Sequence, residues 1–296
     1  MHLRVGTRRS RLALAQAEEV ATLLRALGHE IELVPMSTAG DRGASPISSP
    51  SGGKGLFVGD ITEALLRGDI DAAVHSAKDL PSEDPPGSVI AAVPLRGKPN
   101  DVLVSREAEL DPSAVIGTSS LRRRAQLLRS QPGLKVVDMR GNVDTRLRRM
   151  GEGRVDALAL AAAGLERLRL EPEHVTSLAV DEMVPAPGQG ALAVQAAQAL
   201  PAADAVSAID HPESREAFEA ERELVALLGG GCRLPLGAYA ERQEGILRLL
   251  AVVIRPDGSD LLWSAVQAET PHEAAGQAAE VLRAAGAAEI LAEVAE

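Results

Sequence analysis

The chain has 296 residues, of which 45% are hydrophobic and 25% charged, and its formal net charge is -11 at pH 7. That length favours two or three domains, each able to bury its own core, with the composition of an ordinary globular protein. The acidic balance argues against a general binder of polyanions, and a 1% share of aromatic residues excludes base stacking, so no nucleic-acid partner is expected.

Apolar runs alternate with helical patterns through the first two-thirds of the chain. Strands are expected over 3–6, 30–37, 70–74, 102–105, 115–117, 135–139 and 155–161, and helices over 10–27, 56–67, 120–129, 143–150 and 164–170. This alternation indicates α/β layers with largely parallel sheets. The segment 42–55 is rich in Ser, Pro and Gly and reads as a long loop; such loops are either disordered or lids over a site.

The pattern changes after Pro212. A helix comes first, three strand-like runs follow it, and an Ala-rich helix closes the chain; these elements are expected over 212–228, 237–240, 247–254, 262–268 and from 271. Strands in succession indicate a small α+β module. The connections that read as linkers are 94–101, 185–190 and 200–211.

Three polar segments, 75–81, 117–123 and 140–146, each follow an expected strand directly. In open α/β sheets, ligands bind at the carboxyl ends of strands, where helix N-termini offer free N–H groups. The residues of helix-capping type in these segments are Thr118, Ser119, Ser120 and Asn142. The alternative for each segment is a capped helix with solvated basic residues. Arginine in a first helical turn opposes the helix dipole, however, and its repetition favours a shared anionic ligand.

Arginines are clustered along the sequence. The groups are Arg8, Arg9 and Arg11; Arg122, Arg123 and Arg124; and Arg140, Arg146, Arg148 and Arg149. Codon composition explains an excess of Arg over Lys, but it does not explain the clustering. Arginine makes planar, two-pronged contacts with carboxylates and phosphates. Because no G-x-x-x-x-G-K-[ST] phosphate loop occurs, a multiply carboxylated small molecule is the expected ligand.

The single cysteine lies where the expected helix 212–228 runs into Gly229-Gly230-Gly231-Cys232-Arg233. One cysteine permits neither an internal disulfide nor a four-cysteine metal site, and no metal is expected. Cys232 reads either as a small buried apolar residue or as an attachment point, since glycines let a ligand approach and Arg233 favours the thiolate. No signal region or long apolar stretch is visible, so a reducing cytoplasm without membrane insertion is expected.

Seven segments, taken in order, resemble the porphobilinogen deaminase family, also called hydroxymethylbilane synthase, over essentially the full length. They are Gly6 to Ala13, Gly52 to Phe57, Val74 to Pro81, Gly117 to Arg123, Arg140 to Arg146, Pro185 to Ala191 and Gly230 to Gly237. Each alone is a modest signal, but all of them in order are highly specific. The departures are Arg124 and Asp144, at positions where variation is expected, and Pro187, which stiffens the 185–190 segment.

The resemblance implies an α/β fold of three domains. Two are doubly wound domains of the type II periplasmic-binding-protein kind, between which the chain crosses twice, and the third is a small α+β domain with a three-stranded antiparallel sheet. The implied ranges are 1–95 with 190–208, including the lid 42–55; 96–189, with an Arg-rich face; and 212–296, with Cys232. A monomer is implied.

The resemblance also implies an enzyme of porphyrin biosynthesis. Four porphobilinogen molecules are joined head to tail with loss of ammonia on a covalent dipyrromethane cofactor, and water releases hydroxymethylbilane. By position, Cys232 would be the thioether attachment and Asp79 the catalytic acid. The cofactor would be held by Lys78, Thr118, Ser119, Ser120, Arg122, Arg123 and Arg146. The substrate would be bound by Arg8, Ser10, Arg140, Arg146, Arg167 and Gln189, and the lid would end at Lys54 and Phe57.

Asp79 suits that role physically. Loss of ammonia from an aminomethylpyrrole leaves a cation, and a carboxylate ~4 Å away at an effective dielectric of about 20 is worth about 4 kcal/mol. Half of that, expressed only in the transition state, is a rate factor on the order of thirtyfold. The alternative for Asp79 is a turn or cap partner ahead of Pro81. The alternative for the chain is a non-catalytic, two-lobed binding or sensor protein. Growth of the product predicts motion at both crossovers and in the loop 42–55.

Overall fold

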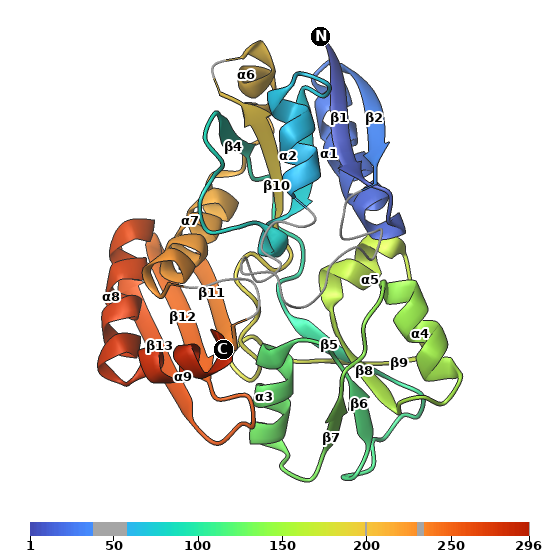
Figure 1. Ribbon diagram of the computed structural model, residues 1–296, viewed down its shortest axis with the longest axis vertical. Coiled ribbons are helices and arrows are strands. Elements are labelled where there is room, and N and C mark those ends of the chain that lie inside the picture. Colours follow the sequence, from blue (N-terminus) through green and yellow to red (C-terminus); the bar gives the residue numbers. More distant parts are fainter. Residues whose placement is uncertain (38–57, 199, 230–233, 296) are drawn as a thin grey trace.

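The computed structural model describes residues 1–37, 58–198, 200–229 and 234–295. Within them, two five-stranded sheets and one three-stranded sheet form the framework (Figure 1). The two larger sheets lie one above the other in that view, and the three-stranded sheet lies beside the lower one. Each sheet falls within one of the three ranges expected for a domain, and we keep that division as a proposal.

The first sheet has the strand order β2-β1-β3-β10-β4. Its strands are β1 (His2–Arg8), β2 (Glu30–Met36), β3 (Ala72–Ser76), β4 (Ser88–Ala92) and β10 (Leu192–Ala197). β1 runs parallel to β2 and β3, whereas β10 runs antiparallel to β3 and β4. The helices packed on it are α1 (Arg11–Ala26), α2 (Gly59–Leu66) and α6 (Pro201–Ser207).

Helix α1 illustrates how the sequence builds this layer. The Ser10 hydroxyl accepts a hydrogen bond from the Ala13 N–H at 3.2 Å and thereby caps the helix. Val20 and Leu24, four residues apart on one face, are fully buried and pack against β1. Burial of such a side chain contributes about 1.5–3 kcal/mol. The helix expected over 10–27 is confirmed within a residue at each end.

The second sheet has the order β7-β6-β8-β5-β9. Its strands are β5 (Asp101–Ser105), β6 (Val115–Gly117), β7 (Lys135–Val137), β8 (Ala157–Ala161) and β9 (His174–Ser177). β6 runs parallel to β7 and β8, and β5 runs antiparallel to β8 and β9. Its helices are α3 (Leu121–Ser130), α4 (Val143–Gly151) and α5 (Ala162–Leu168).

The two sheets share one pattern of strand directions because the chain crosses between them twice. The first crossing, 93–100, joins β4 to β5, and the second crossing, 178–191, joins β9 to β10. Each crossing strand runs against its neighbours, so two of the four pairings in each sheet are antiparallel. The expectation of largely parallel sheets is therefore wrong. Strands β4, β9 and β10 were not predicted, and α6 lies in a segment expected to be a linker.

The third sheet is antiparallel throughout, as predicted. Its strands are β11 (Leu236–Gln243), β12 (Ile246–Ile254) and β13 (Leu261–Ala268), and its helices are α7 (Pro212–Leu227), α8 (Pro271–Ala284) and α9 (Ala287–Ala295). The helices bury one face of the sheet, with Leu224, Leu249 and Leu282 inaccessible to solvent. One closing helix was expected, but the chain turns at Gly286 (φ 100°) and forms two.

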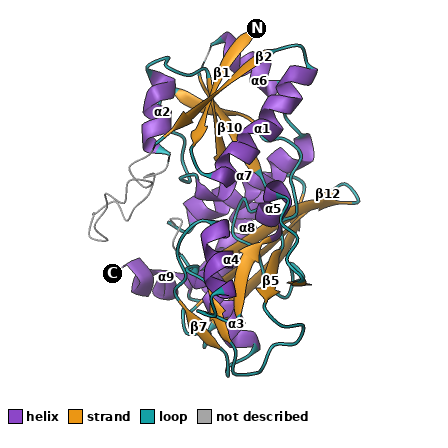
Figure 2. Ribbon diagram, turned by 90° about the vertical axis from the view of Figure 1, so that its right-hand side faces the viewer, coloured by secondary structure: helices purple, strands orange, loops and turns teal. Residues whose placement is uncertain are grey.

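Glu221 on α7 joins the third sheet to both crossings. Its fully buried carboxylate accepts hydrogen bonds from Arg96 in the first crossing at 2.6 and 3.1 Å, and from the Gly188 N–H in the second crossing at 2.6 Å. The Ala240 N–H of β11 donates to it at 2.7 Å. Figures 1 and 2 both show α7 between the first sheet and helix α8 of the third sheet. One side chain thus fixes three segments at a common point.

Candidate active site

A cleft of about 1170 Å³ lies between the two five-stranded sheets. From the first sheet, it is lined by residues that follow β1 and β3, among them Ser10 and Asp79. From the second sheet, it is lined by residues at the start of α4 and along α5, among them Arg146 and Arg167. Helix N-termini and basic side chains therefore face the same space, which suits an anionic ligand.

Asp79 is held in this cleft by its backbone. It ends a short 3₁₀ turn, Ala77–Asp79, and the flanking Ala77 and Leu80 are buried against Phe218. The Asp79 side chain is exposed to the cleft and forms no hydrogen bond or ion pair with the described part of the chain. Among the described residues that line the cleft, it supplies the only carboxylate. That carboxylate is available to a bound molecule.

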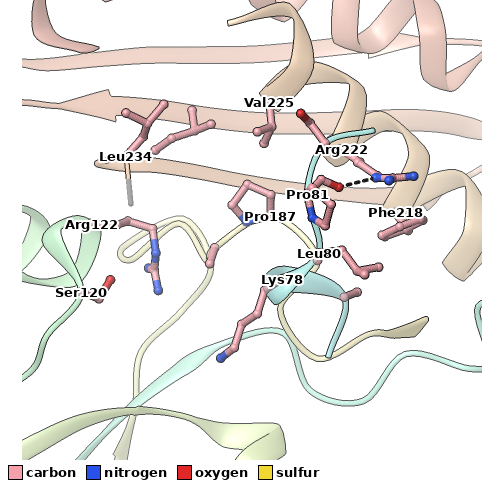
Figure 3. A pocket seen from close by; sticks show the side chains of 15 residues that line it. Lys78, Leu80, Pro81, Ser120, Arg122, Pro187, Phe218, Arg222, Val225 and Leu234 are labelled. Atoms are coloured by element: carbon pink, nitrogen blue, oxygen red, sulfur yellow. Dashed lines mark hydrogen bonds between the residues drawn. The ribbon is translucent and has the colours of Figure 1, made fainter. Parts of the chain in front are cut away.

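Lys78 borders both the cleft and a second cavity of about 790 Å³ (Figure 3). Burial and, after it, the nearby charge of Arg123 lower the pKa of its ammonium to about 8, although the side chain keeps partial access to solvent. The backbone of Lys78 is packed against Gly188, where a Cβ would lie 2.9 Å from the Lys78 nitrogen at a φ of +73°. Only glycine fits there without a shift.

The second cavity lies where the three sheets approach one another. One wall is apolar and comes from the third sheet and its helix, with Phe218, Val225 and Leu234 (Figure 3). The opposite wall carries polar groups from Lys78, Ser120 and Arg122. Leu234 follows Cys232 by two positions in the sequence. The cavity therefore combines cationic donors on one wall with an apolar wall, part of which is close to the cysteine in the sequence.

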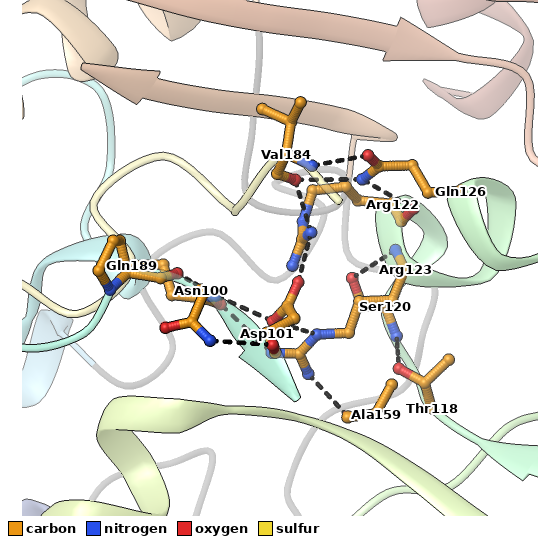
Figure 4. Close-up of polar contacts among 11 residues, drawn as sticks. Asn100, Asp101, Thr118, Ser120, Arg122, Arg123, Gln126, Ala159, Val184 and Gln189 are labelled. Carbon is orange, nitrogen blue, oxygen red and sulfur yellow. Dashed lines mark hydrogen bonds and ion pairs between the residues drawn. The ribbon is translucent and has the colours of Figure 1, made fainter. Parts of the chain in front are cut away.

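Two arginines of the predicted site surround a buried carboxylate in what we call the Asp101 cluster: Asp101, Arg122, Arg123 and Gln189 (Figure 4). The Asp101 carboxylate receives Arg122 Nη1 at 2.7 Å, Arg123 Nε at 2.9 Å and Gln189 Nε2 at 2.9 Å. Burial alone would raise the pKa of Asp101, but the two guanidinium charges and their hydrogen bonds outweigh it and hold the pKa well below its usual range. The cluster is ionised and prearranged.

Arg122 has a buried donor that no acceptor among the described residues satisfies. Its side chain is 3% exposed, and its Nη1 donates to Asp101 and to the Val184 carbonyl, each at 2.7 Å. Its buried Nε–H has no acceptor within the described residues. A buried donor left unsatisfied costs about 1–3 kcal/mol. Because Arg122 lines the smaller cavity, a ligand oxygen there would satisfy it.

Two further predicted residues reach the cleft with partners of their own. Arg146 donates from Nε to the Gly141 carbonyl at 2.7 Å, and burial together with the charge of Arg123 lowers its pKa. Arg167 bridges the sheets, because its Nε contacts Glu19 on α1 at 2.8 Å and its Nη2 donates to the Gly190 carbonyl at 3.0 Å. Both guanidinium groups keep donors beyond these contacts. Arg8 also lines the cleft.

Other predicted residues lie away from both cavities. Arg140 is exposed and pairs with Asp138 at 2.9 Å, Ser119 is exposed, and buried Thr118 accepts a hydrogen bond from the Ser120 N–H at 3.2 Å. Gln189 is fully buried and is committed to the Asp101 cluster. The expected roles of these four in ligand binding stay predictions. Lys54, Phe57 and Cys232 lie outside the described residues, so their expected roles also stay predictions.

Sequence reasoning missed the carboxylates that organise the arginines. Asp101 read as the end of a linker, and no role was predicted for Glu221 or Glu19. Their partners are 21 to 148 positions away along the chain, so no local spacing reveals them. The available signal was weak: an arginine pair in a predicted first helical turn needs a nearby anion.

Two solved structures illustrate a distant resemblance to the fold. A periplasmic substrate-binding protein of an ABC transporter from Coxiella burnetii matches with a TM-score of 0.42 and 16% identity, over 70% of this chain and 91% of that chain. A substrate-binding protein of an amino acid ABC transporter matches with a TM-score of 0.36 and 14% identity, over 75% of this chain and 95% of that chain. Likeness of this extent says nothing about function.

Sequence comparison is far more specific. Two family models match: porphobilinogen deaminase, dipyromethane cofactor binding domain, over residues 3–204, and porphobilinogen deaminase, C-terminal domain, over residues 216–284. Porphobilinogen deaminase from Desulforudis audaxviator is 46% identical over 98% of this chain and 97% of its own length, and the Syntrophotalea carbinolica protein of that name is 44% identical over 98% and 95%. With both domain models and full-length relatives in agreement, the chain belongs to the porphobilinogen deaminase family.

Proposed function

We propose that the chain joins four porphobilinogen molecules head to tail with loss of ammonia and releases hydroxymethylbilane. The observation that carries this proposal is one carboxylate that has no hydrogen-bond or ion-pair partner among the described residues, in a cleft whose other charged lining residues are cationic. The carboxylate is Asp79, and the cations are Arg8, Lys78, Arg123, Arg146 and Arg167. Each porphobilinogen unit carries two carboxylates, so the growing product needs this cationic surface. A single anion among the cations suits a positive charge that develops on the substrate.

The residues of the smaller cavity fit the dipyrromethane cofactor that the family uses. The acceptor missing at the buried Arg122 Nε–H would be a cofactor carboxylate, with Lys78 and Ser120 on the same wall. Cys232 would hold the group through a thioether, next in sequence to the apolar wall that begins at Leu234. When bound, the dipyrromethane supplies the pyrrole carbon to which the first substrate unit is joined.

Asp79 would act at the substrate's aminomethyl carbon. The carbon–nitrogen bond breaks with its electron pair leaving on nitrogen, so the amine must carry a proton and the carbon becomes cationic. The Asp79 carboxylate would stabilise that cation, and because no hydrogen bond within the described residues engages this side chain, it can face the developing charge directly. The surrounding cations orient the substrate carboxylates and keep them away from the reacting carbon.

A cofactor attached to the protein gives a test that does not depend on turnover. The purified chain should show an intact mass larger than its sequence by two pyrrole units, and Cys232→Ser should show the sequence mass alone. Ehrlich's aldehyde reagent, which colours dipyrromethanes, should stain the first protein and not the second. A non-catalytic two-lobed binding protein would bind dicarboxylates but would show the same mass in both, which would refute the proposal.

The catalytic role is tested by Asp79→Asn, with Asp181→Asn as the matched control, since Asp181 is exposed and lines neither cavity. Loss of the carboxylate should lower bilane formation by on the order of thirtyfold or more, and the control should match the wild type. Equal rates in all three proteins would remove Asp79 from the chemistry.

We also propose that the protein is a monomer, because one chain supplies both sides of the cleft, and that it is cytoplasmic. Gel filtration tests the first of these proposals and cell fractionation the second.

A further inference from the structure

Helix α7 contacts the segment that directly follows Asp79. The Arg222 Nε donates to the Pro81 carbonyl at 3.0 Å, and its Nη2 binds the Asp84 carboxylate at 2.7 Å (Figure 3 shows the first contact). These partners lie two and five positions after Asp79. One guanidinium therefore holds both the backbone next to Asp79 and the far end of the same loop.

The Arg222 side chain is itself well fixed. Its guanidinium lies over the ring of Phe218 at 5.6 Å from the ring centre, and its side chain is 18% exposed. Phe218 is 3% exposed and packs against Leu80, the residue after Asp79. The ring and the cation thus support each other and support the loop.

Helix α7 also leads to the proposed attachment point of the cofactor, Cys232. α7 ends at Leu227, five positions before Cys232. The neighbour of Arg222, Glu221, binds the Gly188 N–H, and Gly188 packs directly on the backbone of Lys78. α7 therefore supports the turn that bears Asp79 from two sides and also leads to the cysteine.

We propose that Arg222 is a positioning residue, which fixes Asp79 relative to the helix that leads to Cys232. This rests on the proposed role of Asp79. Because no hydrogen bond or ion pair within the described residues holds the Asp79 side chain, its place in the cleft depends on its backbone, and Arg222 holds that backbone. Displacement of a reacting group by about 1 Å costs up to about a hundredfold in rate.

The test compares Arg222→Ala with Arg215→Ala. Arg215 lies two helical turns earlier on α7, is similarly buried, and binds Asp210 at 2.6 Å and the Ile90 carbonyl at 3.1 Å, away from the loop after Asp79. Cofactor load by intact mass, Tm, kcat and KM are measured for both variants and for the wild type. Hydrogen exchange over residues 77–84 is measured on the cofactor-free Cys232→Ser background.

For Arg222→Ala we expect kcat per cofactor-loaded molecule to fall about tenfold, with KM within about twofold and the load unchanged. Exchange over 77–84 should rise in this variant alone, and Arg222→Lys, which keeps one donor on the loop, should recover part of kcat. Arg215→Ala should lower Tm to a similar extent and keep the wild-type kcat.

The inference is overturned if Arg222→Ala and Arg215→Ala have the same kcat per loaded molecule, or if Arg222→Ala changes only KM or only the load. Should Arg222→Ala fail to fold, Asp84→Ala decides instead, because it removes one anchor from the exposed side of the loop: a loss of kcat of about threefold supports the inference and no loss overturns it. Failure of the proposed function looks different, since the wild type would then carry no added mass and make no bilane.

Discussion

Two groups of arginines that look alike in the sequence have opposite surroundings in the structure. Arg122 and Arg123, at the start of α3, are buried around Asp101. Arg140, just before α4, and Arg146, in its first turns, are exposed and half-buried, and among the described residues their side chains bind one carboxylate and one carbonyl, respectively. The first pair has its geometry set before any ligand arrives. The second pair can adjust to a product that changes length. Clustering of arginine therefore does not by itself distinguish a prearranged site from an adaptable surface.

The largest effect is expected when the buried group, Arg122 and Arg123 around Asp101, loses its carboxylate. Asp101→Asn leaves two buried guanidinium groups without their counterion, so the free energy of unfolding should fall by about 3–5 kcal/mol. Asp138→Asn removes the exposed partner of Arg140 and should change it by less than about 1 kcal/mol. Urea denaturation followed by circular dichroism measures both. Similar losses of unfolding free energy in the two variants would show that burial of the first arginine pair adds no stability over the exposed pairing of Arg140 with Asp138.

A smaller effect, on catalysis, should distinguish Arg146 from Arg140 within the second pair. Arg146 lines the cleft and Arg140 does not, so Arg146→Ala should lower kcat/KM for bilane formation at least about tenfold, the value of one charge-assisted hydrogen bond. Arg140→Ala should stay within about threefold. A larger loss for Arg140→Ala would place that side chain on the substrate after all and would support the role implied by the family resemblance.

The smallest effect concerns Lys78, which borders both cavities. With its pKa lowered by burial to about 8, its amine should become reactive as the pH rises through 8, seen by competitive acylation of the cofactor-free Cys232→Ser protein, with exposed Lys135 as internal reference. Because the ordinary pKa is 10.5, the unfolded chain binds more protons between these values, and the free energy of unfolding should rise with pH across that window. A midpoint near 10.5 would contradict the burial of this group.

Much of the fold could be predicted because local patterns determine it. The spacing of Val20 and Leu24 and the cap at Ser10 define α1, and the change of pattern after Pro212 predicts the separate α+β unit. The strands β4, β9 and β10 could not be predicted in the same way. They have five, four and six residues, and the partners of β10 lie about a hundred positions away in the chain.

The sequence predicts which residue types form the candidate site, but it does not predict which of them bind one another and which remain available to a ligand. The polar segments 75–81 and 140–146 pointed to the cleft, and the family resemblance supplied Asp79. Nothing in the sequence indicates that Gln189 is committed to Asp101, that Arg167 is paired with Glu19, or that Arg140 turns away to Asp138. Such pairings depend on which elements the fold places side by side, and only the three-dimensional structure supplies that.

The crossing strands have a consequence for synthesis on the ribosome. β10 lies between β3 and β4, and β4 pairs with no other strand of the first sheet. Residues up to 177 can therefore emerge with the second sheet already complete, while the first sheet still lacks β10, the strand between β3 and β4. The part of the chain made first finishes folding after the part made later, and until residue 197 emerges the facing edges of β3 and β4 are the surfaces most exposed to wrong partners.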